Sequence, residues 1–64
     1  MKIELKDTFI TDNSTQCKKG CYFVKTRSNA QFEEHAKQAG AIIITPQKAY
    51  ELAKIPADFK IIGI

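Results

Sequence analysis

Residues 21–45, CYFVKTRSNAQFEEHAKQAGAIIIT, decide the fold because they alternate between two kinds of secondary structure. Residues 21–26 combine aromatic and β-branched side chains, which favour a half-buried strand. Residues 28–40 are typical of a helix, with acidic side chains near the start and a glycine at the end. Residues 41–45 form an apolar run typical of a strand covered on both faces. This order predicts parallel pairing with right-handed crossovers.

The predicted helix has its own cap and apolar face. Either Ser28 or Asn29 can cap the first free amides. The positions on the apolar face are Phe32, Ala36 and Ala39. His35 lies beside that face, and we interpret it as a partly exposed helix residue rather than a catalytic one.

The flanking segments extend the same α/β pattern. Residues 2–6 and 8–11 predict two short strands joined by a tight turn, and a polar loop follows them. Thr45 and Pro46 are typical of the cap and first turn of a second helix, which Pro56 ends. The closing stretch FKIIGI, residues 59–64, predicts a further strand. The expected fold is therefore a small α/β domain in which two helices cover a mixed or mostly parallel sheet.

Composition narrows the functional classes. The 64 residues carry a net charge of +3, and no stretch approaches the roughly 20 apolar residues of a membrane span. The charged start of the chain is unlike a signal peptide. Two cysteines and one histidine, without a second cysteine pair, do not match a structural zinc site. We therefore expect a cytoplasmic protein with reduced thiols, no metal and no membrane partner.

Four basic residues form a loose group along the chain: Lys18, Lys19, Lys25 and Arg27. Nucleic-acid platforms cluster such residues with interleaved aromatic side chains, and this pattern is absent from the sequence. We interpret the charges as a solvated face and expect no nucleic-acid partner. A small basic interaction or nucleic-acid-binding module remains the alternative, and a thiol switch at Cys17 and Cys21 is a third hypothesis.

Polar side chains follow two of the predicted strands. TDNS, residues 11–14, comes after one strand, and TRSNA, residues 26–30, comes after the strand at 21–26. In open α/β sheets, ligands bind beyond the carboxyl ends of the strands, near helix N-termini. If the two strands are neighbours, these segments lie side by side and suit an anionic small ligand. On the residues alone, the segments are either such a site or merely a turn and a helix cap.

Residues 11–45 resemble the N-terminal domain of the Mur ligases, ATP-dependent enzymes that add amino acids to the UDP-linked peptidoglycan precursor. That family shows an Asp-Ser-Arg motif, a loop with glycine, an apolar strand, and a helix that leads through Gly-Ala to another strand. The matching positions are Asp12, Gly20, Phe23, Val24, Phe32, Ala36, Gly40 and Ala41. The likeness is strongest to the members that add the third amino acid, expected to be diaminopimelate.

The resemblance also accounts for the closing apolar stretch. In Mur ligases a similar strand leads into the loop that holds the ATP phosphates, and KIIGI matches its beginning. The implied organisation is a UDP-substrate recognition domain at 1–56 and the first strand of a central ATP-binding domain at 57–64. ATP and Mg²⁺ are then cofactors of the parent enzyme and not of this fragment. The implied partners are the parent's central and C-terminal domains and the substrate, UDP-N-acetylmuramoyl-dipeptide.

The family's N-terminal domain binds the uridine and diphosphate end of that substrate, using the motif serine and the loop after the apolar strand. Here DNS replaces Asp-Ser-Arg, so either Asn13 or Ser14 takes the place of the serine, and the arginine is absent. The resemblance implies no catalytic residue in this chain. The substrate-binding residues we expect are Thr11, Asp12, Asn13, Ser14, Thr26, Arg27, Ser28, Asn29, Ala30 and Gln31.

Overall fold

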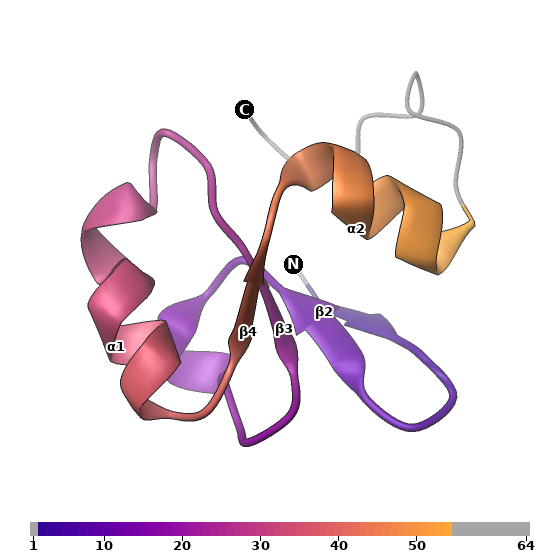
Figure 1. Ribbon diagram of the computed structural model, residues 1–64, viewed down its shortest axis with the longest axis horizontal. Helices are drawn as coiled ribbons and strands as arrows, with labels where there is room; N and C mark the ends of the chain where they lie inside the picture. Colours follow the sequence, from indigo (N-terminus) through magenta and orange to yellow (C-terminus); the bar gives the residue numbers. More distant parts are fainter. Residues whose placement is uncertain (1, 55–64) are drawn as a thin grey trace.

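The computed structural model describes residues 2–54. Its strands are β1 (Lys2–Glu4), β2 (Phe9–Thr11), β3 (Tyr22–Val24) and β4 (Ile42–Ile44). Its helices are α1 (Glu33–Gln38) and α2 (Pro46–Ala53), and two 3-10 turns are η1 (Ser14–Gln16) and η2 (Ala30–Phe32) (Figure 1). The predicted small α/β fold is confirmed. The strand predicted at 59–64 and the domain boundary after residue 56 lie outside the described residues.

The strands form one mixed sheet in the order β1-β2-β3-β4. β1 and β2 make the predicted antiparallel hairpin, whose turn is closed by a hydrogen bond from the Leu5 N–H to the Thr8 carbonyl oxygen at 2.8 Å. β2 pairs in parallel with β3, and β3 with β4, so the predicted parallel pairing is confirmed. Because the carboxyl ends of these three strands share one edge of the sheet, the loops that follow β2 and β3 are neighbours.

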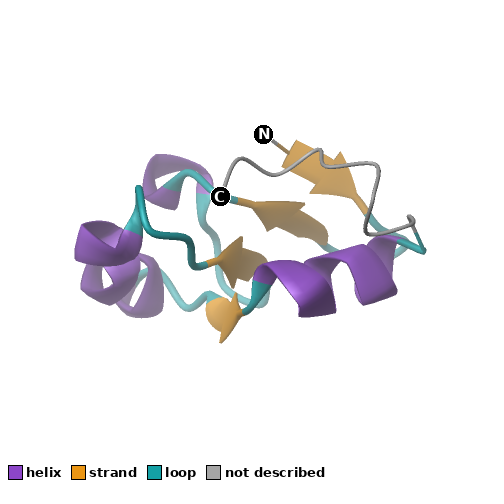
Figure 2. Cartoon of the chain, turned by 90° about the horizontal axis from the view of Figure 1, so that it is seen from above, coloured by secondary structure: helices purple, strands orange, loops and turns teal. Residues whose placement is uncertain are grey.

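The two helices cover opposite faces of the sheet (Figure 2). On the α2 face, Ile10 and Val24 from the sheet pack with Ala49 and Tyr50 from the helix in one buried cluster. On the other face lies Phe23, which is fully buried. Side chains alternate between the two faces of a strand, so β3 contributes to both layers.

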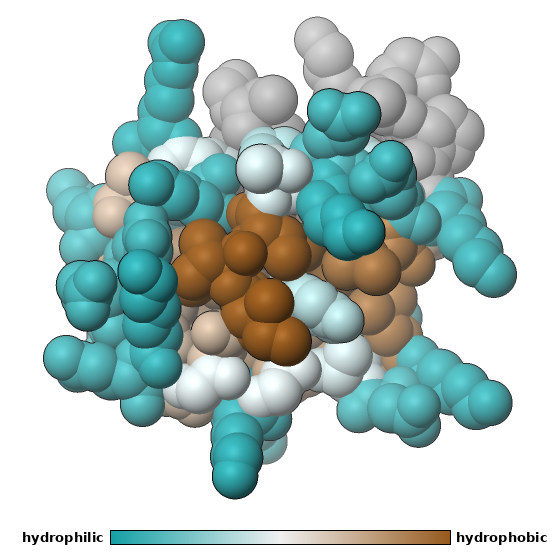
Figure 3. Space-filling model, viewed as in Figure 1, coloured by the Kyte–Doolittle hydropathy of each residue, from teal (hydrophilic) through white to brown (hydrophobic). Residues whose placement is uncertain are grey.

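β4 is less covered than its apolar sequence predicted. Ile42 keeps 49% of its surface exposed, and its neighbours in the strand are only partly buried. Figure 3 shows apolar side chains gathered on the face where Figure 1 places β4. α2 starts at the carboxyl end of β4 and spans only about 12 Å, leading away from the amino end of the strand. The expectation of a strand covered on both faces was therefore wrong.

The boundaries of α1 also differ from the prediction. The α-helix begins at Glu33, after the turn η2, and neither Ser28 nor Asn29 caps it with its side chain. Phe32 is 44% exposed, so the buried part of the predicted apolar face is Ala36 with partly buried Ala39. The predicted stop is confirmed, because Gly40 has a φ of +94°.

The start of α2 follows the sequence closely. The Thr45 hydroxyl oxygen accepts a hydrogen bond from the Lys48 N–H at 3.2 Å, and Pro46 occupies the first helical position. Lys54 then adopts a left-handed conformation with a φ of 58°, and the helix ends at Ala53. Because Val24 at the end of β3 pairs with Ile44 at the end of β4, the start of α2 lies beside the carboxyl end of β3.

Candidate functional site

Asn29 joins the two loops that leave the carboxyl edge of the sheet. Its side-chain Nδ2 donates hydrogen bonds to the carbonyl oxygens of Asp12 and Val24, each at 2.9 Å. Its Oδ1 accepts the Thr26 N–H at 2.7 Å. Asn29 is only 8% exposed, and both amide hydrogens are used. The residue therefore holds the site together, and its amide group is not available to cap α1.

A polar cavity of about 280 Å³ lies between the two loops, and we call it the loop cavity. It is lined by Asp12, Asn13, Ser14, Thr15, Ser28, Asn29 and Phe32. The half-exposed ring of Phe32 supplies the one aromatic surface among these residues. Such a mixture of hydroxyl, amide, carboxylate and aromatic groups suits a polar ring that carries both hydrogen-bond donors and acceptors.

The two candidates for the motif serine make different contacts in the loop cavity. The Asn13 Oδ1 accepts from the Thr15 N–H at 3.0 Å and from the Thr15 hydroxyl at 2.7 Å, which caps the turn η1. The Ser14 Oγ is hydrogen bonded to the His35 Nδ1 at 2.9 Å. Ser14 is thus tied to α1, whereas Asn13 shapes its own loop.

Thr11 supports the loop from beneath. This buried side chain donates to the Gln16 Oε1 at 2.6 Å, and its oxygen accepts the Asn13 N–H at 3.1 Å. Thr11 therefore sets the path of the chain as it leaves β2. It lines neither of the two cavities at this edge.

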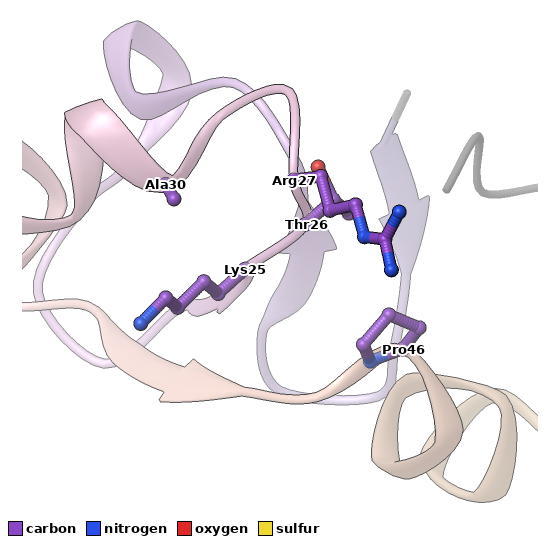
Figure 4. A pocket seen from close by; sticks show the side chains of 5 residues that line it. All are labelled: Lys25, Thr26, Arg27, Ala30 and Pro46. Carbon is purple, nitrogen blue, oxygen red and sulfur yellow. The ribbon is translucent and has the colours of Figure 1, made fainter.

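A second cavity of about 370 Å³ lies between the end of β3 and the start of α2, and we call it the basic cavity. Its lining residues are Lys25, Thr26, Arg27, Ala30 and Pro46 (Figure 4). The side chains of Lys25 and Arg27 extend in opposite directions, with Pro46 on the α2 side (Figure 4). Within residues 2–54, Lys25 has a carboxylate partner and Arg27 has none. The surface that faces this open cavity is mostly apolar, so an anion would contact the two cations at its rim.

The carboxylate partner of Lys25 is Glu33, at the first position of α1. One oxygen lies 2.8 Å from the Lys25 Nζ, and the other lies 3.0 Å from the Lys37 Nζ. Hydrogen bonds from Lys25 and then Lys37 lower the pKa of Glu33 from its usual value of 4.5. The pKa of Lys37 is raised, chiefly by its hydrogen bond to Glu33. This network links the end of β3 to α1.

The structure divides the ten predicted site residues into three groups. Those in the loop cavity are Asp12, Asn13, Ser14, Ser28 and Asn29, and those in the basic cavity are Thr26, Arg27 and Ala30. Thr11 lies beneath the loop and Gln31 is exposed on η2, outside both cavities. The sequence did not indicate Thr15, Phe32, Lys25 or Pro46 as lining residues. These four residues line the cavities only because the carboxyl ends of β2, β3 and β4 lie at one edge of the sheet.

The cysteines lie between η1 and β3 in the chain. Both thiols are free, and the Lys18 N–H donates to the Cys21 Sγ at 3.3 Å. Burial, together with the adjacent Cys21 thiol, raises the pKa of Cys17 to about 12. The reactive thiolate of Cys17 is therefore scarce at neutral pH, which gives the thiol-switch hypothesis no activated nucleophile at Cys17.

Neither a metal-binding cluster nor a helix suited to a membrane is found in the part of the chain that the structure describes. Among residues 2–54, no three His, Cys, Asp or Glu side chains gather in a way that could hold a metal ion. No helix in the same part of the chain has the length and apolar character needed to cross a membrane.

The fold and these cavities define a small α/β domain with a polar site at the carboxyl edge of its parallel strands. Comparisons with models of protein families, with curated proteins and with solved structures found no match to this chain.

Proposed function

We propose that this chain is the UDP-sugar recognition domain of a Mur ligase, similar to that of UDP-N-acetylmuramoyl-tripeptide synthetase (MurE). The observation that carries the proposal is the junction at Asn29, whose amide joins the loop after β2 to the loop after β3. These are the two segments that the family resemblance and the position at the carboxyl edge each single out.

The two cavities suit the two chemical parts of a uridine diphosphate. Uracil presents an imide N–H and two carbonyl oxygens, and the loop cavity offers hydroxyl and amide groups beside the ring of Phe32. The diphosphate is an anion, and the basic cavity brings Lys25 and Arg27 to the same edge. Ser28 lies between them, since it lines the loop cavity and its Oγ is 3.1 Å from the Thr26 Oγ1.

The contribution of this domain to the proposed reaction is positioning. A Mur ligase uses ATP and Mg²⁺ to convert the carboxylate of the precursor to an acyl phosphate, which the amine of the incoming amino acid then attacks. Those groups belong to the parent enzyme, in its central and C-terminal domains. Holding the long substrate by its nucleotide end orients the distant carboxylate and so lowers the entropic cost of the reaction.

The alternative, a small basic interaction or nucleic-acid-binding module, has less support. Lys18 and Lys19 precede β3, whereas Lys25 and Arg27 follow it, so the four cations lie at opposite ends of the strand. A polyanion platform places its cations along one groove.

Isothermal titration of the chain with nucleotides separates the two functions. The ligase proposal expects UDP to bind more tightly than CDP and ADP, because the three diphosphates differ only in the base and the loop cavity is the proposed uracil site. Arg27→Ala is expected to weaken UDP binding and to leave uridine binding unchanged, and Lys48→Ala on α2 is the control outside both cavities. Equal affinity for the three diphosphates, or tight binding of polynucleotides with a steep salt dependence, would contradict the proposal.

A further inference from the structure

Lys25 lines the basic cavity, but its charge is already engaged. The Lys25 Nζ lies 2.8 Å from one carboxylate oxygen of Glu33, close enough for a charge-assisted hydrogen bond. In Figure 4 the lysine side chain extends away from Arg27. An anion in the cavity must therefore share Lys25 with Glu33 or draw the ammonium away from it.

Glu33 is placed to compete with such an anion. It is the first residue of α1, and its second oxygen is held 3.0 Å from the Lys37 Nζ one turn further along the helix. The carboxylate is thus fixed between two cations that come from different elements. The lysine stem is flexible, whereas the glutamate is anchored twice, so the movable partner in this contact is Lys25.

We propose that Glu33 is a built-in competitor of the ligand's phosphate groups, which holds the Lys25 ammonium at α1 and thereby limits the affinity of the basic cavity for anions. The inference rests on the proposed function in one respect, namely that the anion is the diphosphate of a UDP-sugar. The consequence is a moderate affinity for the anion. Arg27 can contact the ligand at once, whereas Lys25 must first be released from Glu33.

The chain offers a matched control for this role. Glu34 is the next residue of α1, is 79% exposed at its side chain, and lies 3.8 Å from Lys37. Among the ion pairs of residues 2–54, Glu34 has no contact with Lys25. Glu33→Gln and Glu34→Gln remove the same charge from the same helix, and only the first frees Lys25.

The experiment measures binding of inorganic pyrophosphate, UDP and ADP to the unaltered chain and to both variants. Glu33→Gln is expected to bind pyrophosphate and UDP about threefold more tightly, the effect of removing an exposed ion pair that competes with the ligand. Glu34→Gln is expected to change the affinity less. In a Lys25→Met background the gain from Glu33→Gln is expected to disappear, whereas a general effect of charge or of helix stability would persist.

The outcomes distinguish the role of Glu33 from the proposed function. If UDP binds to all variants more tightly than ADP, and Glu33→Gln matches Glu34→Gln or binds more weakly, the inference is overturned and the proposed function stands. If Glu33→Gln gains pyrophosphate affinity through Lys25 but UDP has no advantage over ADP, the inference stands and the proposed function falls. Absence of anion binding in every variant overturns both. Circular dichroism of each variant checks that the helices are retained.

Discussion

The side-chain Nδ2 of Asn29 lies 2.9 Å from the main-chain carbonyl oxygen of Asp12, to which it donates a hydrogen bond across seventeen residues of sequence. This contact links the loop after β2 to the loop after β3. Because the same side chain also bonds Val24 and Thr26, a single amide holds the ends of β2 and β3 together at the loop cavity.

Asn29→Ala is expected to lower the free energy of unfolding by about 3 kcal/mol, because it leaves three main-chain groups without their partner in a buried place. Asn13→Ala is the matched control. It removes an exposed asparagine that caps only the short turn η1, and we expect a loss of about 1 kcal/mol. Urea unfolding of both variants measures the difference. Equal losses would show that Asn29 does not join the loops.

Gly40 and Gly20 make a second matched pair. Both have positive φ, +94° and +88°, but a Cβ on Gly40 would lie 2.8 Å from the Lys19 Cα, whereas one on Gly20 would meet nothing within 4 Å. Gly20→Ala is expected to cost about 1 kcal/mol from backbone conformation. Gly40→Ala is expected to cost about 3 kcal/mol, because the turn that contains Lys19 must also move. Thermal unfolding distinguishes them, and similar midpoints would contradict the close approach.

Glu33 gives stability a specific dependence on pH. Its pKa is lowered in the folded chain from the usual 4.5, so the ion pairs contribute fully above that value. As pH falls below it, the unfolded chain takes up the proton first and the contribution is lost. The difference in unfolding free energy between the unaltered chain and Glu33→Gln is expected to shrink in this acidic range. A difference independent of pH would contradict the assignment.

Cys17 makes a corresponding prediction at alkaline pH. Its pKa in the folded chain, about 12, lies above the usual 9.0. Stability is therefore unaffected by this thiol below pH 9.0 and falls as pH rises toward 12. At mildly alkaline pH, iodoacetamide is expected to label Cys17 more slowly than it does after unfolding in urea. In Cys21→Ala the labelling rate of Cys17 is expected to rise, since the Cys21 thiol contributes to the raised pKa of Cys17. Labelling of Cys17 at equal rates in the folded and unfolded chains would contradict this prediction.

Local sequence signals were sufficient for most of the elements. The aromatic and β-branched residues of 21–26 predicted β3, and Thr45 with Pro46 predicted the start of α2. The parallel sheet followed from their order. The side-by-side position of the two loops was predicted only on the condition that β2 and β3 are neighbours, and the register confirms that they are.

The errors have a common physical origin in long-range contacts. Asn29 is a good helix cap by its chemistry, but its Oδ1 already accepts the Thr26 N–H, while its Nδ2 bonds the carbonyl oxygens of Asp12 and Val24. Ile42 is exposed because α2 extends away from the amino end of β4. The contact between Ser14 and His35 spans 21 residues and arises when α1 packs against η1. The pattern of residues along the chain does not predict contacts between residues so far apart in the sequence.

The most direct test of the proposed function is a chemical-shift titration of the ¹⁵N-labelled chain with UDP. We expect the amide signals of residues 12–15 and 26–30 to move together and saturably, because Asn29 makes their two loops one site. The turn at residues 18–20, at the other end of β3, is expected to stay unchanged. Shifts confined to that basic turn, or none in the two loops at saturating UDP, would contradict the account.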